Sequence, residues 1–335
     1  MLTMLFAIMI SFFTVLFLAP AMKKFLERAG VVGVDQQKKE RPKLATSAGV
    51  LVITGVLLGG FFSIGIYTFL THTTLNMAYV LAAYCSILIV TFIGFLDDLN
   101  VSKNPKKIKG ITDIRIGLRQ WQKPLLTLPA AIPLMAIMAG TKTMDLPFLG
   151  AVDFGIMYPL VLIPFAVVTV SNAANMLAGT NGLETGLGIV SMLSLGIYTL
   201  MLGRTEASLI AFVVCFSLLA FLKWNWFPAK FLPGDSLTYL IGASFASIVI
   251  IGNIEKFGIV VFAPWIIEAF LKLRSKFRAR SLGNLQKDGT LAAPYDKIYS
   301  LTHLVMKIKP MKEWEVTTIL ICLEAVICVL AFLFV

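Results

Sequence analysis

Charged residues and histidines are scarce in this chain of 335 residues. Only 14% of the residues are charged, and histidine occurs twice, at His72 and His303. Two histidines are too few for a histidine-rich metal centre. The four cysteines lie within apolar runs without metal-ligand spacing, so we expect small buried side chains rather than zinc ligands or a disulfide framework. The chain also has no Walker loop and no Gly-x-Ser-x-Gly motif, which gives little weight to the chemistries those motifs serve.

Apolar residues dominate what is present. They make up 58% of the chain, and the mean hydropathy is +0.86. A soluble protein cannot bury so much apolar surface. The composition therefore predicts an all-α integral membrane protein in which residues 1–335 form one polytopic domain. The first apolar segment ends in Lys23-Lys24 without a small-residue cleavage site, so we expect a retained helix.

Apolar runs long enough to cross a bilayer predict a bundle of about ten transmembrane helices. They lie near 2–22, 48–70, 77–96, 121–139, 156–178, 183–202, 206–223, 236–253, 257–273 and 315–335. Pro124, Pro129 and Pro133 predict a kink in the fourth span. A short hairpin is expected over 140–155, and an amphipathic surface helix over 294–309.

Lysine and arginine are distributed unequally between the two sides of the predicted bundle. They gather in the loops after spans one, three and nine, whereas the alternate loops 71–76 and 140–155 hold only Lys142. The positive-inside rule then makes the basic loops cytoplasmic and both termini external. The predicted cytoplasmic loops lie near 23–47, 97–120, 179–182, 224–235 and 274–314. A net charge of +11 is explained partly by this topology and partly by binding of phosphate.

Polar residues that are rare at membrane depth recur at this cytoplasmic edge. They are Asp97 and Asp98 after span three, Asn172 and Asn175 late in span five, Asn181 in the next turn, and Asp235 at the start of span eight. Each has a simpler explanation when taken alone: Asp97-Asp98 as a helix end beside lysine and arginine, Asp235 as a helix cap, Asn181-Gly182 as a turn, and Asn172 and Asn175 as links between helices. Their coincidence on one side favours a functional site.

The chemistry that these residues suit is phosphoryl transfer between two anions. Carboxylate and amide oxygens are hard ligands that can hold Mg²⁺, with Mn²⁺ as an alternative. Lysine and arginine can neutralise the remaining phosphate oxygens, and a carboxylate can orient or deprotonate an attacking phosphate.

The motifs resemble those of the polyprenyl-phosphate N-acetylhexosamine-1-phosphate transferases, and most closely the archaeal-type dolichyl-phosphate branch. Four blocks carry the resemblance: Gly94 to Asp98, Ser171 to Glu184, Lys223 to Tyr239, and the basic loop around Arg278-Ala279-Arg280. The resemblance implies transfer of N-acetylhexosamine-1-phosphate, with N-acetylglucosamine as the default sugar, from a UDP-sugar to a polyprenyl or dolichyl phosphate. UMP is released, and the reaction is the first membrane step of glycan assembly, of the N-glycan kind.

The resemblance also implies roles for individual residues. Asn175 and Asp235 would ligate Mg²⁺, and Asp97 and Asp98 would serve the catalytic step. The expected substrate-binding residues are Asp35 in the nucleoside pocket, Asn181 by the uracil, Lys123 at phosphate, and Asn172, Arg278 and Arg280. For the last two, an alternative is that they only anchor the loop on the cytoplasmic side.

Three departures from the family pattern affect these assignments. Arg278-Ala279-Arg280 stands where the dolichyl branch has an Arg-His-Arg-like triplet and the peptidoglycan branch has a histidine cluster. The stretch Ala45-Thr46-Ser47-Ala48 lacks the acidic residue common before Gly49. The loop 99–119 is longer than in eukaryotic members, so that Asn100 is only a loose match.

Two other classes of protein compete with the transferase. An ion-coupled transporter would place ionisable groups near the midplane, where Glu268 and Glu324 are the few acidic residues. A structural scaffold would leave the edge motifs unexplained. The expected location is a prokaryotic, archaeal-type cell membrane, and the expected partners are the two substrates and the bilayer, without nucleic acid. The sequence leaves the oligomeric state open, with a homodimer as one option.

Overall fold

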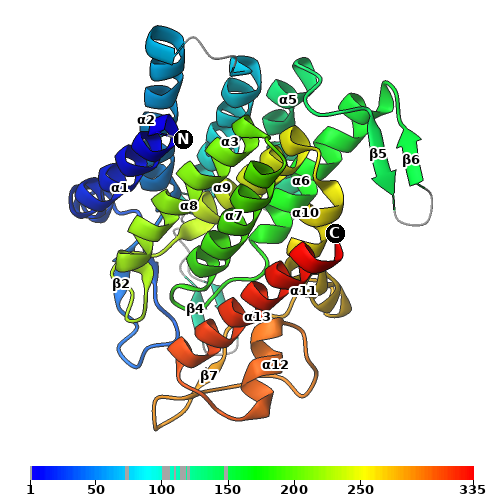
Figure 1. Cartoon of the computed structure of the whole chain (residues 1–335). Coiled ribbons are helices and arrows are strands. Elements are labelled where there is room, and N and C mark those ends of the chain that lie inside the picture. The colour runs from blue at the N-terminus through cyan, green and yellow to red at the C-terminus, as the bar shows by residue number, and fades with distance from the viewer. Residues whose placement is uncertain are drawn as a thin grey trace.

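The computed structural model describes residues 2–71, 75–99, 106–108, 111–113, 118, 121–146 and 150–335. Asn100 and much of the predicted loop 97–120 lie outside the described residues. Figure 1 shows a bundle of helices that carries short strands near its two ends. Each sheet in the described part is a two-stranded antiparallel hairpin.

Within the described residues, seven helices are long and apolar enough to cross a membrane. They are α1 (Leu2–Arg28), α2 (Gly49–Ile66, continued by η1, Tyr67–Thr71), α3 (Met77–Leu99), α7 (Leu183–Met201), α8 (Thr205–Asn225), α9 (Gly234–Gly252) and α13 (Glu313–Phe334). The protein is therefore a multi-pass helical membrane protein, as the composition predicts.

The other three predicted spans coincide with interrupted helical segments. They are α4 (Gln122–Thr127), η2 (Leu128–Ala131) and α5 (Ile132–Ala136); η3 (Tyr158–Leu162) and α6 (Ile163–Ala174); and α10 (Glu255–Val261) and α11 (Ala263–Arg274). The kink in span four is confirmed, with Pro129 at the start of the 3₁₀ turn. The total of ten crossings stays a prediction.

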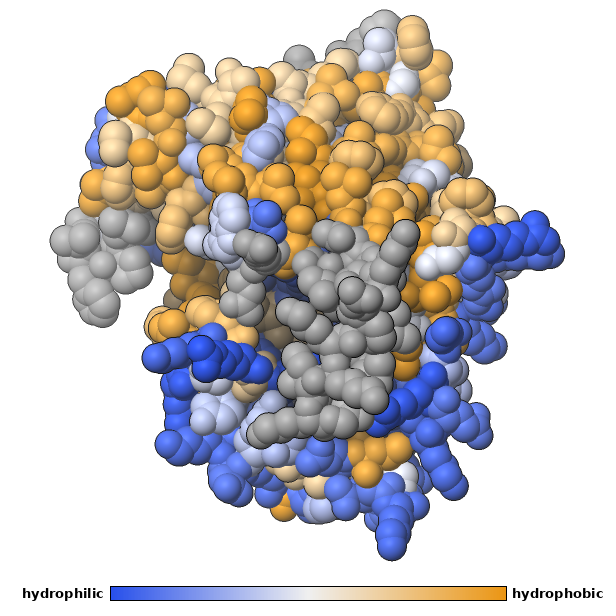
Figure 2. All heavy atoms as spheres, turned by 180° about the vertical axis from the view of Figure 1, so that it is seen from behind, coloured by the Kyte–Doolittle hydropathy of each residue, from blue (hydrophilic) through white to orange (hydrophobic). Residues whose placement is uncertain are grey.

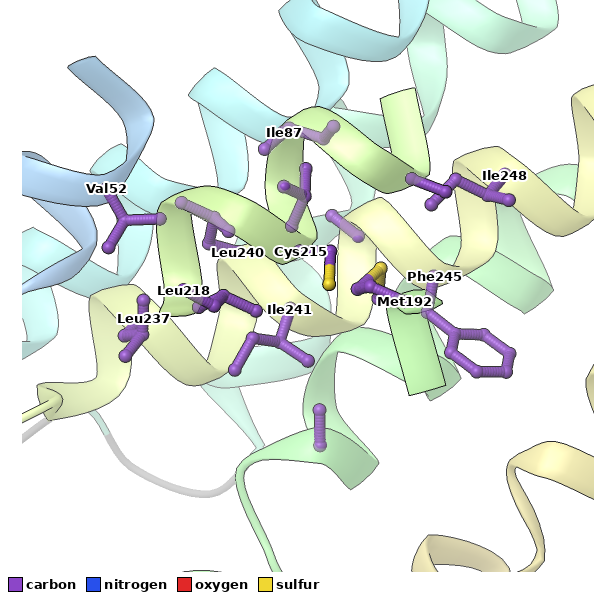
Figure 3. Close-up of a cluster of buried hydrophobic side chains, with 14 of the residues drawn as sticks. Val52, Ile87, Met192, Cys215, Leu218, Leu237, Leu240, Ile241, Phe245 and Ile248 are labelled. Carbon is purple, nitrogen blue, oxygen red and sulfur yellow. The ribbon is translucent and has the colours of Figure 1, made fainter. Parts of the chain in front are cut away.

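Helix α9 is the centre of the bundle. It contacts α2, α3, α6, α7 and α8, and of the candidate spans it has the largest share of its length buried. Figure 3 shows α9 side chains such as Leu240 and Phe245 among buried residues of the neighbouring helices. Burial on every side fixes the position of the first turn of α9, which carries Asp235.

Glycines allow two helices to approach the backbone of α9 closely. A Cβ atom on Gly94 of α3 would lie 2.6 Å from Ser236 Cα, and one on Gly242 of α9 would lie 2.5 Å from Ser171 Cα of α6. Atoms of side chains do not approach so closely, so these contacts require glycine. The ends of α3 and α6 are thereby held against α9, which brings Asp98 and Asn175 to its first turn.

One end of the molecule is more polar than the rest. Figure 2 shows a mainly hydrophobic upper part and a mainly hydrophilic lower part on the face in view. In Figure 1 the strands β2 (Lys43–Ala45, paired with β1, Val32–Val34) and β7 (Asn284–Leu285, paired with β8, Leu291–Ala292) lie toward this lower end, with α12 (Leu301–Ile308). The strands β3 (Lys106–Ile108) and β4 (Ile111–Asp113) also pair.

Two local predictions have different outcomes. The hairpin expected over 140–155 is present as β5 (Thr143–Leu146) and β6 (Gly150–Asp153). The helix expected over 294–309 is wrong in extent, because it begins only at Leu301, where the Ser300 side chain accepts a hydrogen bond from the Thr302 amide. Leu301 and Val305 are buried in the protein, so these two positions are not available to a lipid surface.

Candidate active site

Three charged side chains from three helices meet at the hydrophilic end. Asp97 lies near the end of α3, Lys123 in α4, and Asp235 in the first turn of α9. The Lys123 ammonium nitrogen is 2.7 Å from Asp97 Oδ2 and 2.8 Å from Asp235 Oδ2. One positive charge is thus shared by two carboxylates, which leaves one negative charge in excess in this cluster. Such a cluster attracts a further cation.

Asp98 is adjacent in sequence but has different contacts. Its carboxylate accepts hydrogen bonds from the backbone amides of Asp235 at 2.9 Å and Ser236 at 3.2 Å, and from Ser47 Oγ at 2.5 Å. The amides at a helix N-terminus have no partner within the helix, and a carboxylate placed there satisfies them. Asp98 therefore fixes the N-terminus of α9, in the way that a capping residue would, from another helix.

The two asparagines at the end of α6 form hydrogen bonds with different residues. Asn175 is at the C-terminal end of α6, where its Oδ1 accepts a hydrogen bond from Thr238 Oγ1 at 3.1 Å, and it also neighbours the Asp235 carboxylate. The Asn172 amide donates to Thr127 Oγ1 at 3.0 Å and to the Val168 carbonyl at 2.8 Å. Asn175 thus belongs to the Asp235 cluster, whereas Asn172 links α6 to α4.

The donor set of the cluster fits a hard divalent cation. An ammonium already stands between Asp97 and Asp235, and the Asn175 amide oxygen lies on the same side of the first turn of α9. Carboxylate and amide oxygens are the ligands that Mg²⁺ prefers. Among the described residues, no group of three or more His, Cys, Asp or Glu side chains is placed to hold a metal ion, so an ion here would also need the amide oxygen of Asn175.

A polar pocket of about 170 Å³ opens beside this cluster, and Asp35 and Asn181 both line it. Asn181 Nδ2 donates to Asp35 Oδ2 at 3.2 Å, and Asn181 Oδ1 accepts from the Ala229 amide at 3.0 Å. The turn that carries Asn181 has glycines at both sides, Gly179 with φ +125° and Gly182 with φ +82°, which are angles that glycine adopts without strain. Gly234 also lines the pocket, directly before Asp235.

A larger apolar cavity of about 580 Å³ lies between α6, α9 and the segment α10–α11. It extends from Met144 and Glu255 at one end to Leu273 and Phe277 at the other. Ala173, which also lines it, is two residues before Asn175. The cavity therefore approaches the Asp235 cluster along α6, and its apolar walls suit a hydrocarbon chain.

The arginine loop is exposed at Arg278 and half-buried at Arg280. Lys272 of α11 donates to the Ala279 carbonyl at 3.0 Å and to Ser281 Oγ at 2.7 Å, and Ser281 Oγ bonds to the Met176 carbonyl at 3.3 Å. The loop is thus attached next to Asn175. Burial, and then the nearby Lys272, lower the pKa of His303 below this loop to about 4, so His303 is neutral near pH 7.

Sequence reasoning missed several residues that the structure brings to the site. Lys38 is one of many lysines in a basic loop, and nothing in the pattern distinguishes it. Glu313 has a clearer signal in the sequence than Lys38, because an acidic residue at the start of an apolar helix is either exposed or paired. Ser47 occupies the stretch where the sequence lacks the expected acidic residue, and its hydroxyl contacts Asp98 there.

Comparison with known proteins shows the family to which this chain belongs. The pattern of glycosyl transferase family 4 matches residues 80–253, which include the ends of α3 and α6 and the whole of α9. The chain belongs to this family. It is a membrane-embedded glycosyl-1-phosphate transferase, and the transporter alternative is not supported.

Individual relatives extend over most of the chain. A Saccharolobus solfataricus protein with the provisional name UDP-N-acetylglucosamine–dolichyl-phosphate N-acetylglucosaminephosphotransferase is 34% identical over 98% of this chain and 96% of its own. The enzyme of that name from Dictyostelium discoideum is 26% identical over 75% of this chain and 66% of its own. A Bacillus subtilis protein, provisionally an undecaprenyl-phosphate N-acetylglucosaminyl 1-phosphate transferase, is 27% identical over 78% of this chain and 67% of its own.

Proposed function

We propose that the protein transfers N-acetylglucosamine-1-phosphate from UDP-N-acetylglucosamine to a polyprenyl phosphate of the dolichyl type. An oxygen of the lipid phosphate attacks the β-phosphorus of the nucleotide sugar. The bond between the β-phosphorus and the bridging oxygen breaks, and UMP leaves with that oxygen. The product is a lipid pyrophosphate that carries the sugar.

The observation that carries this proposal is the position of the charged cluster between two cavities of different chemistry. The polar pocket with Asp35 and Asn181 reaches the cluster at Gly234, and the apolar cavity extends along α6 as far as Ala173, two residues before Asn175. A nucleotide in the first and a polyprenyl chain in the second would bring their phosphates together at Asp97, Lys123 and Asp235. Holding both reactants in that geometry supplies much of the rate enhancement of such a transfer.

The residues of the cluster divide the work. Asn175 and Asp235 would hold Mg²⁺, with Mn²⁺ as an alternative, and the ion supplies charge neutralisation at the phosphates. Lys123 then turns from its carboxylates to a phosphate oxygen, and Asp97 orients or deprotonates the lipid phosphate. Asp98 holds α9 in place.

The remaining predicted site residues have supporting or binding roles. Asp35 and Asn181 receive the nucleoside, and Arg278 and Arg280 contact the sugar or the pyrophosphate. Asn172 acts through its bond to Thr127, which keeps α4 and therefore Lys123 in register with α6. We place the site on the cytoplasmic side, where the UDP-sugar is available and where the basic loops are expected.

The test is turnover by the purified protein in detergent, measured as UMP released from UDP-N-acetylglucosamine with a polyprenyl phosphate. Asp235→Ala should reduce turnover at least about 100-fold, because it removes a metal ligand and a partner of Lys123. Chelation of divalent metal should stop the wild-type enzyme, and added Mg²⁺ should restore it.

Asp153→Ala is the matched control. Asp153 lies in β6, and its side chain accepts a hydrogen bond only two residues away, from Gly155. This variant should keep wild-type turnover. Full activity of Asp235→Ala, or undiminished UMP release after chelation, would refute the proposed cluster chemistry.

A further inference from the structure

The C-terminal helix reaches back to the polar pocket. Glu313, the first residue of α13, is only 3% exposed. Its Oε1 accepts a hydrogen bond from the Asn181 backbone amide at 2.7 Å. One turn later, Thr317 Oγ1 donates to the Asn181 carbonyl at 3.1 Å and bonds to Thr180 Oγ1 at 2.9 Å. The backbone of Asn181 is therefore held on both sides by α13, a helix that does not line the pocket itself.

Lys38 connects Glu313 to the other wall of the pocket. Its ammonium group pairs with Glu313 Oε2 and lies 3.2 Å from Asp35 Oδ2. The same nitrogen stands 4.7 Å from the centre of the Phe227 ring. Asp35 in turn accepts the hydrogen bond from Asn181 Nδ2. The four residues Asp35, Lys38, Asn181 and Glu313 thus form a closed network, which we call the base clamp.

The charges of the base clamp indicate which end of a nucleotide can bind beside it. Two carboxylates and one ammonium leave one negative charge in excess, and all three groups are largely buried. A phosphate would be repelled here, whereas a neutral nucleobase with an N–H donor would not. The clamp therefore suits the base end of a nucleotide, while Lys123 marks the phosphate end.

We infer that Glu313 and Lys38 are positioning residues that fix Asn181 and Asp35 for recognition of the uracil base. The inference rests on the proposed function, because it assumes that the polar pocket takes the nucleotide. Glu313 and Lys38 act through Asn181 and Asp35 and do not line the pocket themselves. Without Glu313 or Lys38, the turn at Gly179–Gly182 would be free to move, because glycine adopts many backbone conformations. The hydrogen-bonding groups of Asn181 and Asp35 would then no longer have fixed positions for the base.

The simpler explanation is that Glu313 only stabilises α13. An acidic residue in the first turn of a helix interacts favourably with the helix dipole, whatever lies opposite it. That role would affect thermal stability and yield of folded protein. It would not change how the pocket distinguishes one base from another.

The test measures binding of UMP and CMP to the purified protein by calorimetry, together with KM and kcat for UDP-N-acetylglucosamine. Glu313→Ala and Lys38→Met should each weaken UMP binding roughly 10- to 100-fold, the size expected when a charged hydrogen bond is lost. KM should rise by a similar factor, while kcat changes less than about threefold, because the phosphate end is intact. The preference for UMP over CMP should fall in both variants.

Two further variants sharpen the result. Glu315→Ala is the matched control, because Glu315 lies in the same helical turn and its carboxylate accepts a hydrogen bond from the Lys312 backbone amide at 2.7 Å, within α13's own N-terminus. It should leave UMP binding and base preference unchanged. In the double variant Lys38→Met with Glu313→Ala, the losses should not add, since both substitutions open the same network.

The outcomes separate the two proposals. If the wild-type protein does not bind UMP, the proposed function fails. If the wild type binds UMP but Glu313→Ala and Lys38→Met keep its affinity and base preference, the clamp inference fails while the proposed function stands. A loss of thermal stability with unchanged binding by the folded fraction would also overturn the clamp and leave Glu313 as a structural residue.

Discussion

Asp97 and Asp98 are identical and adjacent in the sequence, but their side chains have different contacts. Near the end of α3 their side chains point in different directions, so that Asp97 meets the Lys123 ammonium and Asp98 meets the first amides of α9. The first arrangement places the Asp97 carboxylate beside a lysine, a residue type that can also bind phosphate. The second uses the Asp98 carboxylate as an acceptor for two backbone amides and the Ser47 hydroxyl. We therefore assign chemistry to Asp97 and positioning to Asp98.

Replacing each aspartate by asparagine should separate these roles. Asp98→Asn turns one acceptor into a donor facing Ser47 or the α9 amides, so we expect the free energy of unfolding to fall by roughly 1.5–3 kcal/mol. Asp97→Asn keeps the packing but removes the charge, and we expect kcat to fall about 100-fold or more with little change in stability. Thermal unfolding in detergent measures the loss of stability. The rate of UMP release at saturating substrates measures the loss of kcat. The reverse pattern, a stable Asp98→Asn and an unfolded Asp97→Asn, would exchange the assignments.

The sequence indicated which side chains are unusual but not which of them meet. Asp97, Asn175 and Asp235 could be singled out because polar residues at the ends of apolar spans are costly. The close packing at Gly94 that brings α3 to α9 depends on three-dimensional contacts, which spacing alone does not reveal. For the same reason, the Asn172 bond to Thr127 could not be distinguished from substrate binding.

Interrupted helices form most of the wall of the apolar cavity, and the long helix α9 forms most of the rest. The segment α10–α11 breaks at Phe262, which is followed by Pro264 in the first turn of α11, and the π-helical η3 precedes α6. Proline lacks the amide hydrogen that a continuous helix needs. The cavity lies between these interrupted segments and α9. The prolines of span four predicted its kink, and Pro264 accompanies a similar break between α10 and α11 within the predicted span 257–273.

Filling the cavity should affect the lipid substrate alone. Ala166 of α6 lines it, and Ala166→Trp would occupy part of its volume. We expect KM for a long polyprenyl phosphate to rise about 10-fold or more, with a smaller effect on a two-isoprene acceptor and none on UMP binding, because a shorter chain leaves more of the cavity unused.

Leu193→Trp provides the comparison for this variant. Leu193 is on α7, is 40% exposed and does not line the cavity. It should behave as the wild type with both acceptors. Equal effects of Ala166→Trp on long and short acceptors would show that the polyprenyl chain lies elsewhere.

In the proposed mechanism the whole molecule brings two very different substrates to one edge of a helical bundle. The strands β2 and β7, which are far apart in the sequence, both lie toward that edge in Figure 1, and the face in view in Figure 2 is mainly hydrophilic there and mainly hydrophobic above it. The predicted positive-inside topology faces this edge to the cytoplasm. Composition and loop charge were sufficient for the membrane fold and for the side on which the site is expected. The base clamp was not predictable, because it joins residues 275 positions apart.

The identity of both products tests the central claim most directly. The enzyme should be incubated with UDP-N-acetylglucosamine and a polyprenyl phosphate, the nucleotide product separated by chromatography, and the lipid product analysed by mass spectrometry. Attack at the β-phosphorus predicts UMP and a lipid with two phosphates and one N-acetylhexosamine, formed in equal amounts. Release of UDP, with a lipid that carries the sugar on a single phosphate, would show transfer of the sugar alone and would contradict this account.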